Sequence, residues 1–111
     1  MLIAEPNAEV RRLFETVVRA LGWSSATYAP DADATAVDVV VLEPSFLEAV
    51  ERLEAMPARE RPPVVLVSIY PQDERTRALD AVAFLQKPFA VGELQCALRE
   101  ATAEPAAIQT T

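Results

Sequence analysis

Four polar or charged side chains follow four short, largely apolar segments, and these residues are the best placed to do chemistry. They are Glu5, Glu43, Ser68 and Lys87, which follow LIA, VVVL, VVLV and AFLQ at or near their ends. Short apolar runs are typical of strands buried on both faces of a parallel sheet. Taken alone, Glu43 would be a solvated loop carboxylate. Ligands of parallel sheets sit at the carboxyl ends of the strands, so two acids, a hydroxyl and a lysine together predict a site there.

Four stretches carry apolar residues at helical spacing and predict the helices that support these strands. The first runs from an N-cap at Asn7 to a stop at Gly22, and the others cover 46–56, 71–82 and 89–103. The residues expected to face the core are Val10, Leu13, Phe14, Val17, Val18 and Leu21; Phe46, Ala49, Val50 and Leu53; Ala78, Leu79 and Val82; and Val91, Leu94, Leu98 and Ala101.

Strands and helices alternate along the chain, which predicts an α/β fold. The expected strands are 1–5, 23–28, 37–43, 63–68 and 83–86. Segment 23–28 is partly polar, which favours an edge position, and 29–36 is expected to be a loop with at most one turn of helix. We therefore expect one domain over 1–103, with a five-stranded parallel sheet covered by helices on both faces, and a flexible tail at 104–111.

Composition argues against several kinds of partner. The 111 residues are 51% hydrophobic and 24% charged, as expected for one folded domain with a single core. A net charge of −7 disfavours nucleic acid, because phosphate contacts need a basic surface. The chain has no apolar run near the ~20 residues of a membrane span, and MLIAEPN lacks the basic region of a signal peptide. We expect a cytoplasmic protein that binds neither nucleic acid nor membrane.

Composition also argues against several kinds of chemistry. The chain has no histidine, so a zinc site or a Ser-His-Asp triad is not expected. Its single cysteine, Cys96, cannot form an internal disulfide, and we interpret it as a small packing residue within the last helix. Two glycines cannot build a phosphate-cradling loop, which argues against a flavodoxin-like cofactor binder. We expect no cofactor.

The order and spacing of four segments resemble one known family. MLIAEPNAEVRRLFETVVRALGW is similar to the opening strand and helix of response regulator receiver domains, and VDVVVLEPS to their phospho-acceptor strand. PPVVLVS is similar to the strand that ends in Ser or Thr, and FLQKPF to the strand that ends in Lys-Pro. The resemblance covers 1 to about 103. It implies strand order 2-1-3-4-5 and a role in bacterial two-component signalling.

The resemblance assigns roles to the candidate residues, and two of them depart from the family pattern. Glu5 and Pro6 occupy the positions of an acidic pair that holds Mg²⁺, but proline has no carboxylate, and Mg²⁺ demands near-ideal octahedral oxygen geometry. Glu43 replaces the aspartate that accepts the phosphoryl group, and its extra methylene moves the carboxylate about 1.5 Å outward. Ser68 and Lys87 match the hydroxyl and the lysine that contact the phosphoryl oxygens.

Further matches concern the switch and interaction surface of the family. Phe84 matches the aromatic side chain that rotates on activation, and Pro88 matches a proline whose preceding bond is cis. Val91 lies on the usual partner surface, which the last two helices form with the strand that carries Phe84. The chain between Gly22 and Glu43 is too short for the second helix of the family, which we expect to be missing or vestigial.

These departures predict a degenerate receiver that takes no phosphate and is not an enzyme. Glu43 is expected near Lys87, either as a fixed imitation of the phosphorylated state or as an inert structural ion pair. Such a domain would act by docking to a partner protein or to a second copy of itself. The alternative is a functional receiver that a histidine kinase still phosphorylates.

A missing second helix predicts uncovered apolar surface on the first two strands. Large exposed apolar patches are uncommon on monomers, and the edge strand 23–28 would add unpaired backbone groups on the same flank. We therefore expect self-association or a capping partner at this flank, unless 29–36 folds back over it.

Overall fold

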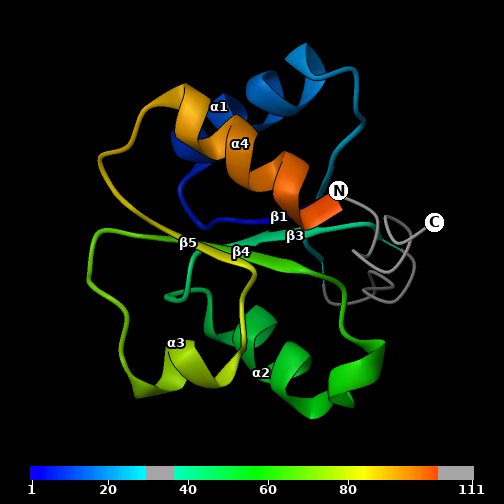
Figure 1. Cartoon of the computed structure of the whole chain (residues 1–111), viewed down its shortest axis with the longest axis vertical. Coiled ribbons are helices and arrows are strands. Elements are labelled where there is room, and N and C mark those ends of the chain that lie inside the picture. The colour runs from blue at the N-terminus through cyan, green and yellow to red at the C-terminus, as the bar shows by residue number, and fades with distance from the viewer. Residues whose placement is uncertain (30–36, 103–111) are drawn as a thin grey trace, which may run out of the picture.

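Five parallel strands form the centre of the computed structural model, which describes residues 1–29 and 37–102 (Figure 1). The strands are β1 (Leu2–Ala4), β2 (Ala26–Thr27), β3 (Val40–Leu42), β4 (Val64–Ser68) and β5 (Ala83–Gln86). Their order in the sheet is β2-β1-β3-β4-β5, with β2 and β5 at the edges. The predicted order is therefore confirmed, as is the edge position of the segment 23–28.

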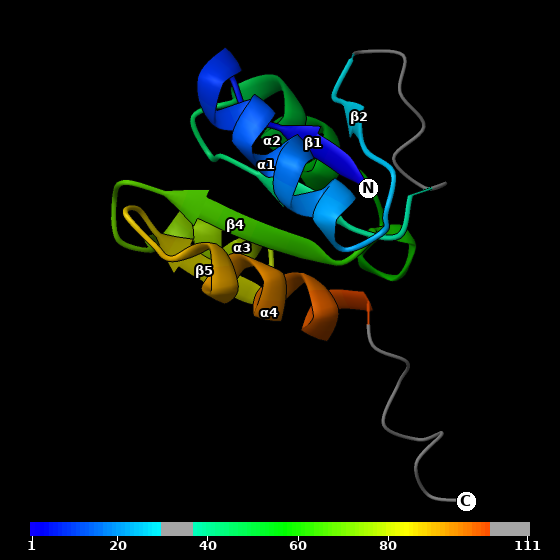
Figure 2. The same cartoon turned by 90° about the horizontal axis from the view of Figure 1, so that it is seen from above.

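Helices cover both faces of this sheet, as expected. They are α1 (Ala8–Ala20), α2 (Leu47–Ala55), α3 (Glu74–Ala78) and α4 (Val91–Thr102), with a short 3-10 helix, η2 (Ala58–Glu60), after α2. Figure 1 shows α1 and α4 on one side of the sheet and α2 and α3 on the other, and Figure 2 shows the same arrangement from above.

Alternating side chains of the strands divide the core into two halves. Ile3, Val41 and Val65 face the half formed with α1 and α4, while their neighbours Leu42 and Leu66 face the half formed with α2 and α3. Residues of β1, β3 and β4 are buried on both faces, which explains the continuous apolar runs. Full burial of one such side chain contributes about 1.5–3 kcal/mol before entropy is counted.

Helix α1 begins and ends where its sequence signals predict. The Asn7 side chain accepts hydrogen bonds from the backbone N–H groups of Glu9 and Val10, and so caps the helix. Gly22 follows the C-cap with φ +83°, a conformation that favours glycine. One residue of the predicted apolar stripe is misplaced, because Leu13 is 52% exposed. It lies at the margin of the stripe, outside the buried cluster that Phe14, Val17 and Val18 join.

Helix α3 is shorter than predicted and faces the core with different residues. It has five residues within the expected 71–82, and both Ala78 and Val82 are exposed. Thr76 is buried instead, because its hydroxyl and the Asp73 side chain form a capping box that turns it inward. Leu79 is buried as predicted.

Helix α4 also departs from prediction at two positions. Cys96, interpreted as a packing residue, is exposed, with its sulfur 3.8 Å from a carboxylate oxygen of Glu100. Val91, the first residue of the helix, is 47% exposed. Ala97, which the stripe left out, is buried beside Leu94 and contributes to the core.

The flank next to β2 is better covered than the sequence predicts. All three residues of β1 are buried, so the expected bare apolar surface on this strand is wrong. Tyr28, directly after β2, supplies the cover: its ring packs edge-on against Phe46 at 5.1 Å and lies 6.0 Å below the Arg52 guanidinium. Ala26 and Thr27 of β2 are exposed but small.

Several expectations concern residues beyond those described. The described residues between β2 and β3 hold no helix. Of the loop or lid expected at 29–36, residues 30–36 lie outside the described residues. The tail expected at 104–111 also lies outside them. No helix in the described ranges is long and apolar enough to cross a membrane.

Candidate functional site

Three of the four chemistry-bearing side chains meet at the carboxyl edge of the sheet. The ammonium Nζ of Lys87 donates to Oε1 of Glu5 at 2.7 Å and lies 3.5 Å from Oε2 of Glu43. The prediction that Lys87 pairs with one of these acids is therefore confirmed. Glu5 is its closer partner, and Glu43 is the second. We call these three residues the acid–lysine cluster.

Parallel pairing explains why residues so far apart in the chain come together. Ala4 pairs with Leu42 in register, so Glu5 and Glu43, the next residues, emerge side by side. Strand β4 extends to Ser68, which pairs with Gln86, the residue before Lys87. The backbone N–H of Lys87 donates to the Ser68 carbonyl at 2.6 Å and fixes the end of β5. The Lys87–Pro88 bond is cis, as the resemblance implies.

Both carboxylates of the acid–lysine cluster are buried. Glu5 is 2% exposed and Glu43 7%, so both carboxylates depend on partners inside the protein. Glu5 also accepts from the Asn7 backbone N–H at 3.1 Å, and Glu43 from the Ser45 backbone N–H at 3.2 Å. In the described part of the chain, every buried side-chain nitrogen and oxygen has a hydrogen-bond partner.

The side chains at this edge do not fit the Mg²⁺ that a receiver site would hold. Pro6 is exposed and offers no side-chain oxygen. Each carboxylate oxygen of Glu5 and Glu43 already faces Lys87 or a backbone N–H group, so the two acids do not offer a metal ion a set of free oxygen ligands. Among the described residues, no group of three or more His, Cys, Asp or Glu is arranged to hold a metal ion. Mg²⁺ needs several free oxygen ligands in octahedral geometry, which this donor set lacks.

Ser68 lies at the same edge, but its hydroxyl is bonded outside the acid–lysine cluster. Its hydroxyl accepts a hydrogen bond from the Tyr70 backbone N–H at 3.1 Å, within the β4–α3 loop. In the described residues no hydrogen bond joins the Ser68 hydroxyl to the side chain of Glu43 or Lys87. The Ser68 hydroxyl therefore supports the start of the loop that follows β4, while Lys87 links the two acids.

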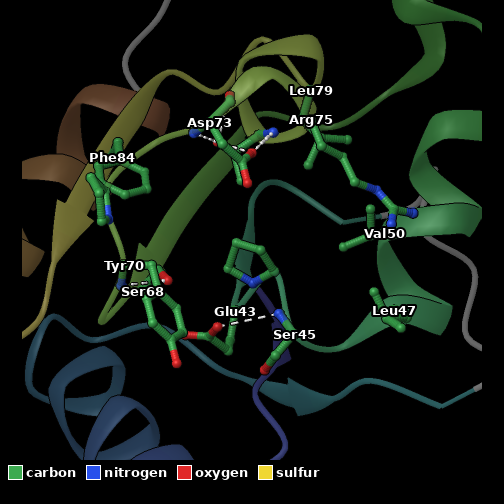
Figure 3. Close-up of a pocket in the computed structure, with 13 residues that line it drawn as sticks. Glu43, Ser45, Leu47, Val50, Ser68, Tyr70, Asp73, Arg75, Leu79 and Phe84 are labelled. Carbon is green, nitrogen blue, oxygen red and sulfur yellow. Dashed lines mark hydrogen bonds between the residues drawn. The ribbon is translucent and has the colours of Figure 1, made fainter.

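Beside the cluster lies a groove, the α2–loop groove, which the sequence did not predict. Its volume is about 310 Å³, and Figure 3 shows side chains that line it. The lining residues are Glu43, Pro44, Ser45, Leu47, Val50, Ser68, Tyr70, Pro71, Asp73, Arg75, Thr76, Leu79 and Phe84. The only local signal was the loop sequence IYPQD, in which two apolar residues precede turn residues.

Two switch residues named by the resemblance occupy different places. Phe84, on β5, is half-buried and lines the α2–loop groove. Val91 is exposed at the start of α4 and does not line this groove. Rotation of Phe84 and docking at Val91 stay predictions.

Solved structures establish the fold. No family model matches the chain, and no curated protein matches it. The chain is similar to a response regulator receiver protein from Burkholderia phymatum, with 22% identity, a TM-score of 0.70, and coverage of 94% of this chain and 96% of that one. This chain has the receiver fold. It is also similar to the receiver domain of sensor histidine kinase PA1611 from Pseudomonas aeruginosa, with 20% identity, a TM-score of 0.75, and coverage of 93% and 96%.

A third similar structure with the receiver fold is a CheY-like response regulator receiver domain from Methylobacillus flagellatus. It shares 22% identity over 90% of this chain and 95% of the other, with a TM-score of 0.71. The Pseudomonas domain is described with a magnesium ion coordinated in its active site cleft.

Proposed function

We propose that this chain is a signalling module of the receiver fold that takes no phosphoryl group and acts by binding a partner protein. The observation that carries the proposal is the position of Lys87, 2.7 Å from Glu5 and 3.5 Å from Glu43. The acids that would hold a metal and accept a phosphoryl group are thus joined to one ammonium. Similarity to receivers of response regulators and a sensor histidine kinase supports the signalling role.

Of the two roles for Glu43, the geometry favours a structural ion pair over an imitation of the phosphorylated state. An imitation would place negative charge against both the lysine and the hydroxyl of the site. Glu43 contacts Lys87 and the Ser45 N–H, while the Ser68 hydroxyl is bonded to the Tyr70 N–H. A buried ion pair of this kind holds the strand ends together and transfers nothing.

The alternative, a receiver that a histidine kinase phosphorylates, rests on the presence of Ser68 and Lys87 at the expected strand ends. It would require Glu43 to leave its bond to the Ser45 N–H and turn toward a donor. It would also require a metal beside Lys87 without the second acid that Pro6 replaces.

Intact-mass spectrometry tests the proposal directly. The protein is incubated with Mg²⁺ and acetyl phosphate, and we expect no phosphate increment. The matched control is the double variant Pro6→Asp, Glu43→Asp. It restores the second acid of the pair and gives position 43 the shorter acidic side chain of the family. A stable increment on the double variant alone would assign the loss to these two positions. An increment on Glu43 of the unaltered protein would refute the proposal.

A further inference from the structure

The α2–loop groove is an open cavity beside the acid–lysine cluster, at the edge where parallel sheets bind ligands. Its lining comes from the end of β3, the start of α2, the β4–α3 loop, α3 and Phe84 of β5 (Figure 3). A volume of about 310 Å³ is at the lower end of ligand pockets, which suits a ring-sized molecule or one bulky side chain.

The walls of this groove are largely apolar, and its rim carries apolar side chains that face water. Val50, Leu79 and Phe84 lie in the walls. Leu47 is 54% exposed and Tyr70 69%. Exposing the apolar surface of such side chains to water costs free energy. Figure 3 shows Leu47 and Tyr70 on opposite sides of the opening. Such a rim favours a ligand with an apolar body.

The charges that line the groove are mainly negative. Lys87 is one ammonium between two buried carboxylates, so the acid–lysine cluster keeps an excess negative charge. Because Lys87 lies closer to Glu5, Glu43 is the less neutralised acid, and Glu43 is the one that lines the groove. Asp73 adds a second carboxylate. The only cation in the lining is Arg75, which is already paired with Glu54 at 3.1 Å.

We propose that the α2–loop groove binds an organic cation: a ring-sized apolar body that carries one primary ammonium or guanidinium group. The body packs against Leu47, Val50 and Phe84, and the cationic group faces Glu43. An anionic ligand of the same shape would meet two carboxylates. The same chemistry is offered by a free amine and by an apolar residue next to a lysine in a partner protein. This inference does not rest on the proposed function, because it concerns the groove and not phosphorylation.

Three probes of similar shape and different charge test the ligand class. Phenethylamine, 2-phenylethanol and phenylacetate are titrated into the isotope-labelled protein at neutral pH and constant salt, and backbone amide shifts are followed by NMR. We expect saturable shifts at Ser45, Leu47 and Tyr70, with phenethylamine binding about fivefold more tightly than the alcohol, as for a partly screened charge pair. Phenylacetate is expected not to bind. Equal affinity for all three probes, no binding of phenethylamine, or shifts confined to another face would overturn the proposal.

Matched variants locate the two parts of the interaction. Leu47→Ser should weaken phenethylamine and the alcohol alike, whereas Leu13→Ser, an equally exposed leucine on α1, should change neither. Glu43→Gln should remove the preference for the amine, whereas Glu60→Gln, an exposed acid in η2, should keep it. Unchanged binding in both Leu47→Ser and Glu43→Gln would contradict the proposal. If Glu43→Gln fails to fold, the comparison of Leu47→Ser with Leu13→Ser and the three probes still test the proposal.

Two capped dipeptides distinguish the sources of the cation. Acetyl-Phe-Lys amide and acetyl-Phe-Gln amide differ in one charge, and the cationic peptide should be preferred. Tighter binding of this peptide than of phenethylamine would assign the groove to a partner segment, and the reverse order to a free amine. If neither cation is preferred over its neutral counterpart, the proposal is wrong. A phosphate increment in the mass experiment would refute the proposed function but leave these results standing.

Discussion

The acid–lysine cluster and the α2–loop groove share one edge of the sheet and one residue, Glu43, yet they differ in what they leave available. In the cluster, one lysine and two backbone N–H groups occupy the carboxylates. The groove is open, with exposed apolar side chains on its rim and negative charge in its wall. The comparison teaches that charged side chains at one edge of a sheet can engage one another while the surface beside them stays open.

The largest expected effect comes from breaking the cluster at its cation. Lys87→Ala leaves two buried carboxylates close together, and we expect the free energy of unfolding to fall by about 2–3 kcal/mol. Urea denaturation measures it. Arg75→Ala is the comparison, because it breaks an exposed pair with Glu54 that should contribute at most about 1 kcal/mol. Equal losses in the two variants would show that burial does not strengthen the cluster.

A smaller effect distinguishes the two acids. Glu5→Gln should destabilise the protein by about 1–2 kcal/mol, because Glu5 is the closer partner of Lys87 and also accepts from the Asn7 N–H. Glu43→Gln should cost less, about 0.5–1 kcal/mol, because its contact with Lys87 is 3.5 Å. The same denaturation experiment compares them, and a larger loss for Glu43→Gln would reverse the assigned order of the two pairs.

The rim of the groove should tolerate change. Tyr70→Ser alters a side chain that is 69% exposed, so we expect the free energy of unfolding to change by no more than about 0.5 kcal/mol. Phe14→Ala, on the opposite side of the sheet, is the buried control and should cost about 3–5 kcal/mol. A large loss for Tyr70→Ser would mean that the rim supports the fold and is not reserved for a ligand.

The smallest effect concerns the Asp73 cap at the far end of the groove. The Thr76 backbone N–H, which donates to this carboxylate, holds the pKa of Asp73 below its usual value of 3.8. A pKa that is lower in the folded state adds stability above the unfolded value and loses it as pH falls through the folded value. The unaltered protein should therefore be slightly more stable than Asp73→Asn near pH 5, and this difference in stability should disappear as the pH falls to about 2. Acid titrations followed by circular dichroism measure it. A constant difference between the two proteins over this range would contradict the shift.

Local patterns were sufficient for most of the fold. The Asn7 cap and the Gly22 stop define α1 because they act on backbone groups within a few residues. Continuous apolar runs predicted β3 and β4, since a strand buried on both faces needs apolar residues in succession. With parallel strands, it followed that Glu5, Glu43 and Lys87 would come to one edge.

Margins of amphipathic patterns were less predictable. Leu13 and Val91 have the right spacing and type, but both are exposed, because spacing along a helix does not say how wide a face the neighbouring layer covers. Thr76 is polar and was passed over, yet its hydroxyl is satisfied within the α3 cap and can be buried. Tyr28 covers β1 by contacts with Phe46 and Arg52, which no local pattern specifies.

The sequence by itself determined the order of strands and helices and which polar residues end the strands, because periodicity and capping are properties of neighbouring residues. Only the tertiary structure decided that Lys87 pairs more closely with Glu5, 82 positions away, than with Glu43. It also decided that the start of α2 and the β4–α3 loop stand apart and leave a groove. These features depend on distances of a few ångströms between elements remote in the chain, and such distances are set by how whole layers pack.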